Sequence, residues 1–265
     1  MPNELSIETI ISESDREAGA FEWNGTFADY LRMVIERPST SRLSHALIYD
    51  SIKSQGVYTS AEGEQVYRVF DNEIFGLDTH MDKIVQYFAA SSRRLEIRKR
   101  ILLLLGPPAS GKSSVIELIK RNLENYTRTD EGAVYAIEGC PMQEDPLHLI
   151  PEGLRSELNN QYGIYVEGYL CPRCNHTLKT KYKGNVSEMP VHRVVFSEHQ
   201  AVGIGHYIAT NPNPDVALLV GSVDENKLEG DRSEIAGTAT TDDSDSRWDS
   251  ESVWLRYYAV SSVSK

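Results

Sequence analysis

Cysteine is scarce in this chain: only three of its 265 residues are cysteines, and two of these share a C-x-x-C spacing. Such a low number excludes a fold held together by several disulfides. Long apolar runs are missing as well, because none approaches the roughly 20 residues that a membrane-spanning helix needs. The polar, acidic residues 1–17 lack the apolar segment of a secretory signal peptide. We therefore expect a cytoplasmic protein without a membrane partner.

Basic residues are also few relative to acidic ones. The chain has 27 Lys and Arg against 39 Asp and Glu, which gives a formal net charge of −12. This balance argues against nucleic-acid binding through a general basic surface and is typical of an acidic, solubilising surface. Hydrophobic residues still make up 40% of the chain. The length and composition therefore suit one large α/β domain with a smaller attachment.

One segment carries a specific motif. Residues 106–113 read G-P-P-A-S-G-K-S, which matches the phosphate-binding pattern G-x-x-x-x-G-K-[S/T]. The apolar run 101–105 before it predicts a buried strand, and residues 115–120 after it predict the start of a helix. In this context the backbone N–H groups of the turn and the helix dipole both favour an anion. A chance glycine-rich turn is the alternative interpretation.

The motif predicts a site for a nucleoside triphosphate with Mg²⁺. Lys112 is expected to reach the β- and γ-phosphates, and the Ser113 hydroxyl is expected to bind Mg²⁺. The predicted nucleotide-binding residues are those of the motif and the serine after it: Gly106, Pro107, Pro108, Ala109, Ser110, Gly111, Lys112, Ser113 and Ser114.

The segments before the motif are mostly helical by pattern. Apolar residues recur at helical spacing over 27–35, and Pro38 closes this segment. A second helix is expected over 44–52, and the aromatic and β-branched residues 65–70 predict a short strand. A further helix is expected from about 77 to a basic cluster that ends at Arg100. We interpret this cluster (Arg93, Arg94, Arg98, Lys99 and Arg100) as a solvated helix face, with an anion-binding patch as the alternative.

Strands and helices alternate after the motif. The sequence predicts strands over 133–137 and 191–196, a loop over 139–146 and a helix that begins near Pro151. An insertion at about 165–190 contains the C-x-x-C pair. Strand–helix alternation around a phosphate-binding loop predicts an α/β fold with a mainly parallel sheet and flanking helices.

Several segments also occur in a familiar order. They are F-E-W-N-G-T-F-A-D-Y-L at 21–31, F-G-L at 75–77, the phosphate-binding loop, G-A-V-Y-A-I-E-G-C-P-M at 132–142, E-D-P-L-H-L-I-P at 144–151, F-S-E at 196–198 and G-I-G at 203–205. Together they resemble the N-terminal AAA+ domain of the PrkA-type serine protein kinases, over most of residues 20–235.

The resemblance implies a P-loop NTPase of AAA+ type that binds ATP and Mg²⁺ in a cytoplasmic bacterial or archaeal protein. It also implies that the full-length proteins transfer phosphate to serines of a protein substrate, with a further C-terminal region that resembles a kinase domain. The resemblance leaves open whether the protein forms a homo-oligomer. We expect an N-terminal helical region over 1–75, the AAA+ domain over 76–237 and a tail over 238–265.

The tail departs from the family pattern near residue 237. The family continues with a Gly-Glu-Leu…Ala-Asn-Arg-Gly stretch and a strand that ends in the Walker B carboxylate, whereas residues 238–247 here are rich in Thr, Ser and Asp. This composition predicts a disordered tail. A truncated or frame-shifted product is the preferred explanation, and a natural short form is the alternative. The Walker B carboxylate, sensor residues and arginine finger are not recognisable.

Catalysis of ATP hydrolysis needs a carboxylate that orients the attacking water, in addition to the groups that bind the phosphates. Glu198, which follows an apolar strand, is the candidate, and a surface glutamate at a strand end is the alternative. The kinase motifs H-R-D-x-x-x-x-N, D-F-G and V-A-I-K are not found in the sequence. We therefore expect this chain to bind ATP, to hydrolyse it weakly and to phosphorylate nothing by itself. An AAA+ remodelling or protease-type regulator and a non-catalytic nucleotide-binding adaptor are the alternatives.

The C-x-x-C pair, Cys171 and Cys174, resembles half of a zinc knuckle. Because Zn²⁺ takes four ligands, His176 and His192 are the candidates for the rest, and Cys140 is the third cysteine of the chain. Reduced structural thiols and a redox dithiol are the alternatives. We expect His148 to be a packed histidine rather than a catalytic one.

Overall fold

Apolar periodicity correctly locates most of the long helices of this protein. The computed structural model describes residues 21–60, 63–71, 73–93, 102–107, 110–200 and 202–204. Its helices are α2 (Phe27–Glu36), α3 (Ser44–Ser54), α4 (Arg68–Asp71), α5 (Asp78–Ser92), α6 (Lys112–Thr127), α7 (Glu152–Tyr162) and α8 (Pro172–Thr180). Short 3₁₀ helices are η1 (Pro38–Ser41), η3 (Pro146–Leu149) and η4 (Val186–Glu188). The strands are β1 (Asn24–Thr26), β2 (Val57–Thr59), β3 (Gln65–Tyr67), β4 (Val134–Ile137) and β5 (Pro190–Val194).

Helix α2 shows how local sequence sets these boundaries. It begins at a capping box, in which Thr26 Oγ1 accepts the Asp29 N–H at 3.3 Å and Asp29 Oδ2 accepts the Thr26 N–H at 3.1 Å. Its buried residues, Phe27, Tyr30 and Val34, lie three and four positions apart and so share one face. The helix ends just before Pro38, since a proline disfavours helical geometry in the residue before it.

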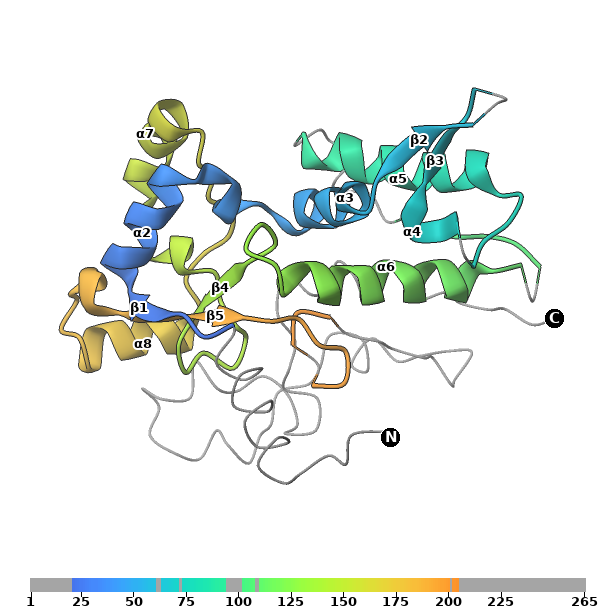
Figure 1. Cartoon of the computed structure of the whole chain (residues 1–265). Helices are drawn as coiled ribbons and strands as arrows, with labels where there is room; N and C mark the ends of the chain where they lie inside the picture. The colour runs from blue at the N-terminus through green and yellow to red at the C-terminus, as the bar shows by residue number, and fades with distance from the viewer. Residues whose placement is uncertain are drawn as a thin grey trace, which may run out of the picture.

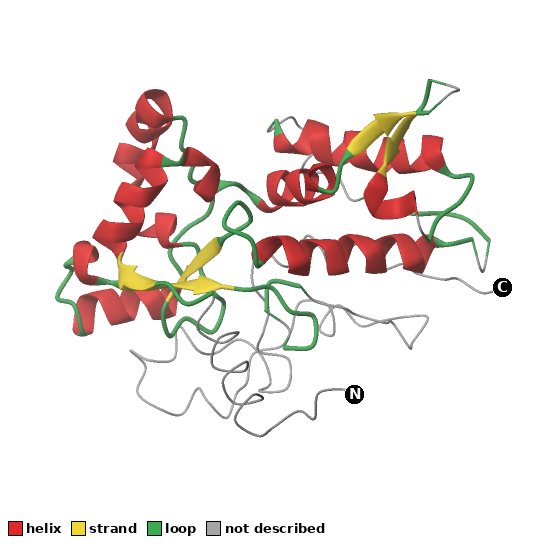
Figure 2. Cartoon of the chain, viewed as in Figure 1, coloured by secondary structure: helices red, strands yellow, loops and turns green. Residues whose placement is uncertain are grey.

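The described strands pair in antiparallel fashion. The three-stranded sheet has the order β1-β5-β4, and Figure 2 shows its short strands, in yellow, beside the helices. Val191 of β5 faces Gly25 of β1 on one side and Ile137 of β4 on the other. A separate hairpin joins β2 and β3, also antiparallel. The predicted parallel sheet is therefore not confirmed within the described residues.

Two strand predictions need correction. The run 101–105 is not a strand over its described residues 102–105, and Leu103 and Leu105 are 59% and 82% exposed. A strand needs a hydrogen-bonded neighbour, and no described strand pairs with this segment. The predicted strand 65–70 stops at Tyr67, because its partner β2 begins at Val57, the residue opposite Tyr67. The chain then turns into α4.

Apolar side chains gather in two cores. Figure 1 shows the elements that carry them, with α3, α5 and α6 on one side of the molecule and α2 and α8 on the other. The α3–α5–α6 core joins these three helices to β3 and α4, and its fully buried members include Ile52, Val85, Phe88, Ile119 and Leu123. The α2–α8 core joins α2 to the end of β4, η3, α8 and β5, and includes Val34, Leu147, Ile164, Met189 and Val191. Helices α2 and α3 thus belong to different cores, although both lie in the predicted helical region 1–75.

The domain boundaries at 75 and 237 remain predictions. The basic residues 94–100 and the tail 238–265 lie outside the described residues. Among the described helices, none combines the length and the apolar character that crossing a membrane requires.

The turn between α6 and β4 is held by two arginines. Arg42 Nη1 donates to Asp50 Oδ2 at 2.7 Å and to the Tyr126 hydroxyl at 3.2 Å. Arg193 Nη2 donates to the carbonyls of Thr127 and Thr129, at 3.3 and 2.7 Å. The turn therefore ties α3 and β5 to the end of α6.

We expect the substitution Gly132→Ala to destabilise this turn. A Cβ at Gly132 would lie 2.1 Å from the Tyr126 carbonyl oxygen, so the backbone would have to shift. The expected loss in the free energy of unfolding is about 1–3 kcal/mol, as for other overpacked sites. Gly153 in α7 is the matched control, since its Cβ would meet nothing within 4 Å and alanine favours a helix. Urea unfolding checks the pair, and equal stabilities would contradict the clash.

Candidate functional site

The phosphate-binding motif forms a turn that leads directly into α6. Gly111, immediately before the helix, has φ of +80°, a conformation that favours glycine. A Cβ at Gly106 would lie 3.0 Å from Ser110 Oγ, so the loop closes tightly on itself there. Pro108 and Ala109 lie outside the described residues. Gly111 thus has a conformational reason to be glycine, and a side chain at Gly106 would crowd Ser110.

Lys112, the first residue of α6, folds back over this turn. Its Nζ donates to the Gly106 carbonyl at 3.0 Å, to the Pro107 carbonyl at 2.7 Å and to Ser110 Oγ at 3.0 Å. An ammonium group has three donors, and all three point into the loop. Phosphate oxygens accept from the same group more strongly, because they carry negative charge. The Lys112 ammonium is thus the donor over this turn that an anion would contact.

The first turn of α6 adds further groups to this site. Ser113 and Ser114 are exposed there. The first N–H groups of a helix have no partner within the helix, and the helix dipole places partial positive charge at the same end. The 16-residue α6 thus presents N–H groups and hydroxyls beside the Lys112 ammonium.

Glu198, the candidate catalytic residue, pairs with α6 farther along its length. Its carboxylate accepts from Lys120 Nζ, and its N–H donates to Glu124. Lys120 follows Lys112 by eight residues, so the ion pair lies about 12 Å along the helix from the first turn. The Lys120 side chain is only 5% exposed. The geometry gives Glu198 a structural partner, and its predicted role with water stays a prediction.

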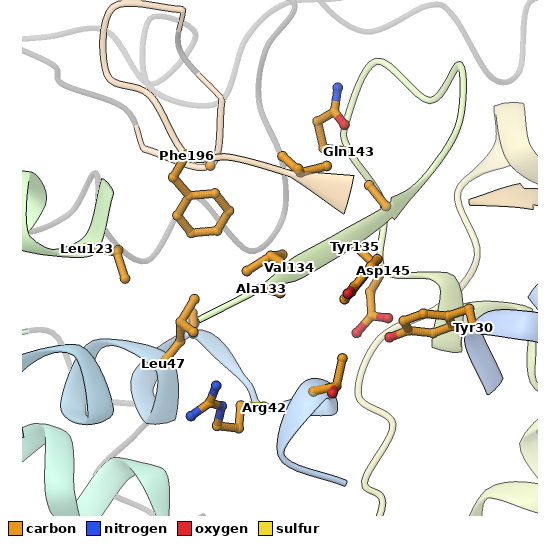
Figure 3. Close-up of a pocket in the computed structure, with 15 residues that line it drawn as sticks. Tyr30, Arg42, Leu47, Leu123, Ala133, Val134, Tyr135, Gln143, Asp145 and Phe196 are labelled. Atoms are coloured by element: carbon orange, nitrogen blue, oxygen red, sulfur yellow. The ribbon is translucent and has the colours of Figure 1, made fainter. Parts of the chain in front are cut away.

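A small cavity lies where the two cores meet (Figure 3). Arg42 and Leu47 approach it from the side of α3, Tyr30 from α2, and Tyr135 and Asp145 from β4 and the loop after it. Its volume is about 70 Å³, well below the several hundred Å³ of a typical pocket for a small-molecule ligand. It is therefore not a nucleotide site.

A second group of chemically distinctive residues lies in the α2–α8 core. Cys171 caps the N-terminus of α8, and its Sγ accepts the Cys174 N–H at 3.3 Å. The structure brings Cys140 and Glu144, from the loop after β4, against this pair. The Sγ atoms of Cys140 and Cys171 lie 3.9 Å apart, and all three cysteines are free thiols.

Mutual hydrogen bonding separates the pKa values of the thiols. The pKa of Cys140 falls to about 3, because the Cys171 and Cys174 thiols donate to it. The pKa values of Cys171 and Cys174 rise, since hydrogen bonding to Cys140 favours their protonated forms. One thiolate thus forms readily in this group.

His148 is buried beside the cysteine group, as expected for a packed histidine. Its Nδ1 donates to Glu144 Oε1 at 3.1 Å and its Nε2 to the Glu167 carbonyl at 2.6 Å. Burial alone would lower its pKa, but the bond to Glu144 and the charge of Asp145 raise it to about 9. Both ring nitrogens therefore donate.

The two histidines proposed from the sequence as zinc ligands do not belong to this group of four residues. His176 is exposed on α8. His192 lies on β5, opposite Ala136 of β4 and Asn24 of β1; burial lowers its pKa, and its Nδ1 has no hydrogen-bond partner among the described residues. The geometry thus assembles the cysteine pair with Cys140 and Glu144, which the sequence interpretation did not combine. One signal was available: Cys140 and Cys171 are each followed by proline.

Comparison with known proteins identifies the family. The sequence pattern of the PrkA AAA domain matches residues 25–236, which is most of the chain. The chain belongs to the PrkA AAA family. The PrkA-type resemblance is thereby confirmed. The match ends at residue 236, next to the position where the sequence predicts the end of the family pattern.

Individual relatives of this PrkA-type chain carry different names. It is 42% identical over 222 residues to "ATP-dependent protease PrkA" of Bacillus subtilis, covering 83% of this chain and 35% of that protein. It is 31% identical over 174 residues to "Serine/threonine kinase YeaG" of Escherichia coli K12, covering 62% of this chain and 26% of that protein. A shorter match, 38% identical over 72 residues, relates it to the Lon protease of Buchnera aphidicola, covering 27% of this chain and 9% of that protein.

The chain therefore spans about a third of the length of the Bacillus subtilis relative and about a quarter of that of the Escherichia coli relative. No solved structure matches it.

Proposed function

We propose that this chain is the ATP-binding AAA+ module of a PrkA-type protein and binds Mg-ATP through residues 106–114. The observation that carries the proposal is the Lys112 ammonium, held over a tight turn at the N-terminus of α6. In this role Lys112 contacts the β- and γ-phosphates, Ser113 binds Mg²⁺, and the N–H groups of the loop bind the remaining phosphate oxygens. The mainly parallel sheet of a P-loop NTPase remains part of the same proposal.

Calorimetric titration of the 265-residue chain with Mg-ATP tests this function. Saturable binding of about one nucleotide per chain is the expected result, weakened when EDTA removes Mg²⁺. If the chain bound no nucleotide at millimolar concentration, the proposal would be overturned, because residues 106–114 would then not form a nucleotide site.

The activity of the full-length protein is a second step of the proposal. The name of the Escherichia coli relative supports serine phosphorylation, so the chain would belong to a transferase. The names of the Bacillus subtilis and Lon relatives support the alternative, an ATP-dependent protease or its regulator. A non-catalytic nucleotide-binding adaptor remains the third possibility. Incubation of a full-length PrkA-type protein that carries this domain with γ-labelled ATP and casein separates these activities, because a kinase labels casein and a protease fragments it.

Glu198→Gln is expected to lower stability through its partner Lys120. The substitution removes the negative charge beside an ammonium whose side chain is 5% exposed. Breaking a fully buried ion pair costs about 3–5 kcal/mol, but Glu198 is 30% exposed, so we expect about 1–3 kcal/mol. Glu117→Gln, at an exposed position of the same helix, is the control. Denaturant unfolding of both variants measures the difference.

The same variant tests the predicted catalytic role of Glu198. If this carboxylate orients water, ATP turnover by the folded variant falls while the affinity for Mg-ATP stays unchanged. Equal turnover of the folded variant and the unmodified chain contradicts the role and leaves Glu198 as a structural glutamate.

A further inference from the structure

Four buried side chains converge in the α2–α8 core. One potential ligand atom from each of Cys140, Glu144, Cys171 and Cys174 lies within 4.8 Å of all the others. Cys140 and Glu144 come from the loop after β4, and Cys171 and Cys174 from the first turn of α8. The group therefore joins two segments about thirty residues apart in the sequence.

The spacing of the sulfurs suits a shared tetrahedral ion. Zinc–sulfur bonds of about 2.3 Å in tetrahedral geometry place two sulfurs about 3.8 Å apart. The Sγ atoms of Cys140 and Cys171 lie 3.9 Å apart. This separation is far longer than the roughly 2.05 Å of a disulfide. The third thiol, that of Cys174, lies within 4.8 Å of both, so the three sulfurs are close enough to share one ion.

Glu144 is held so that one of its oxygens lacks a partner. Its Oε1 accepts the Cys171 N–H at 2.7 Å and faces His148 Nδ1 at 3.1 Å. Its Oε2 is buried and has no hydrogen-bond partner among the described residues. Leaving a buried carboxylate oxygen unpaired is unfavourable. A cation bound to Oε2 would satisfy it, while His148 and the backbone hold the other oxygen in place.

The C-x-x-C pair is pre-arranged as well. Pro172 occupies the first helical position of α8 after Cys171, and Cys171 Sγ accepts the Cys174 N–H at 3.3 Å. This hydrogen bond fixes the position of the Cys171 sulfur at the start of the helix. The local backbone thus orients both sulfurs before any ion arrives.

We propose that Cys140, Cys171, Cys174 and Glu144 bind one zinc ion. Soft thiolates in a tetrahedral set select zinc over magnesium or calcium. Four protein ligands in a buried site leave no coordination position for substrate, so the ion is structural. It fastens α8 to the loop after β4 and stabilises the α2–α8 core. This site is separate from the phosphate-binding turn, so the proposal does not depend on nucleotide binding.

Metal analysis of the full chain tests the proposal. The chain, purified without chelators, is expected to carry about one zinc ion, and Co²⁺ added to the metal-free chain is expected to give thiolate-to-cobalt charge-transfer absorption. Cys140→Ser is expected to abolish zinc retention. Glu144→Gln is expected to weaken zinc binding by at least about tenfold, the lower bound for loss of an outer-shell partner. A chromophoric chelator in competition measures both affinities.

The two histidines of the earlier zinc hypothesis are the matched controls. His176→Gln and His192→Gln are expected to retain zinc with unchanged affinity, because neither side chain belongs to the four-residue group. Zinc loss in His192→Gln with retention in Glu144→Gln would overturn this ligand set. A wild-type chain without zinc and without cobalt–thiolate absorption would overturn the site. The two measurements on the wild-type chain test the site even if a cysteine variant misfolds. The variant Lys112→Ala is expected to retain zinc, because Lys112 belongs to the separate phosphate-binding turn.

Discussion

Replacing Lys112 with alanine is expected to raise the dissociation constant for Mg-ATP by about ten- to a hundredfold. The side chain supplies three charged donors over the phosphate-binding turn, at 2.7–3.0 Å from oxygens of the loop. Loss of a charge-assisted contact to phosphate costs about 1.5–3 kcal/mol, and each 1.4 kcal/mol changes affinity tenfold. Calorimetric titration of the variant measures the change.

Lys83→Ala is the control for the loss of one positive charge. Lys83 is exposed on α5, outside the phosphate-binding turn, so its variant should bind Mg-ATP as the unmodified chain does. Equal affinities in all three proteins would show that Lys112 does not contact the nucleotide. A parallel weakening in both variants would indicate a general effect of net charge instead.

Phe88→Ala is expected to lower the free energy of unfolding by about 3–5 kcal/mol. Phe88 is 2% exposed in the α3–α5–α6 core. Its ring packs edge-on against Tyr87, at 5.4 Å between centroids, and lies tilted against the His45 ring, at 6.4 Å. Truncation removes the burial of a large side chain and leaves a cavity that its neighbours fill only in part. Denaturant unfolding followed by circular dichroism measures the loss.

Phe75→Ala makes the same chemical change at the surface. Phe75 is 77% exposed, so its truncation should change the free energy of unfolding by less than about 0.5 kcal/mol. If both variants unfolded at the same denaturant concentration as the unmodified chain, the packing of α5 against α3 would be incorrect.

Helices were predicted well because their signals are local. The apolar residues 27–35 recur with helical spacing before Pro38, and α2 occupies Phe27–Glu36. The segment after the glycine of the motif likewise became α6. Capping, periodicity and proline act within a few residues of one another, so a single stretch of sequence carries them.

Strands were predicted less well because they depend on a partner. Residues 133–137 and 191–196 have the composition of strands and do pair, as β4 and β5, but in antiparallel fashion. The apolar run 101–105 has an equally suitable composition, yet its described residues pair with no described strand. Composition shows that a segment can form a strand, whereas its direction and its neighbour depend on the rest of the chain.

The sequence by itself determined the phosphate-binding motif and the PrkA family, because both consist of residue types in a fixed order along the chain. Only the tertiary structure decided which side chains meet across that order. It set Cys140 and Glu144, rather than His176 and His192, against the C-x-x-C pair, and it paired Glu198 with Lys120 on α6. These contacts join segments about thirty to eighty residues apart in the sequence, and burial in a shared core, not local pattern, holds them together.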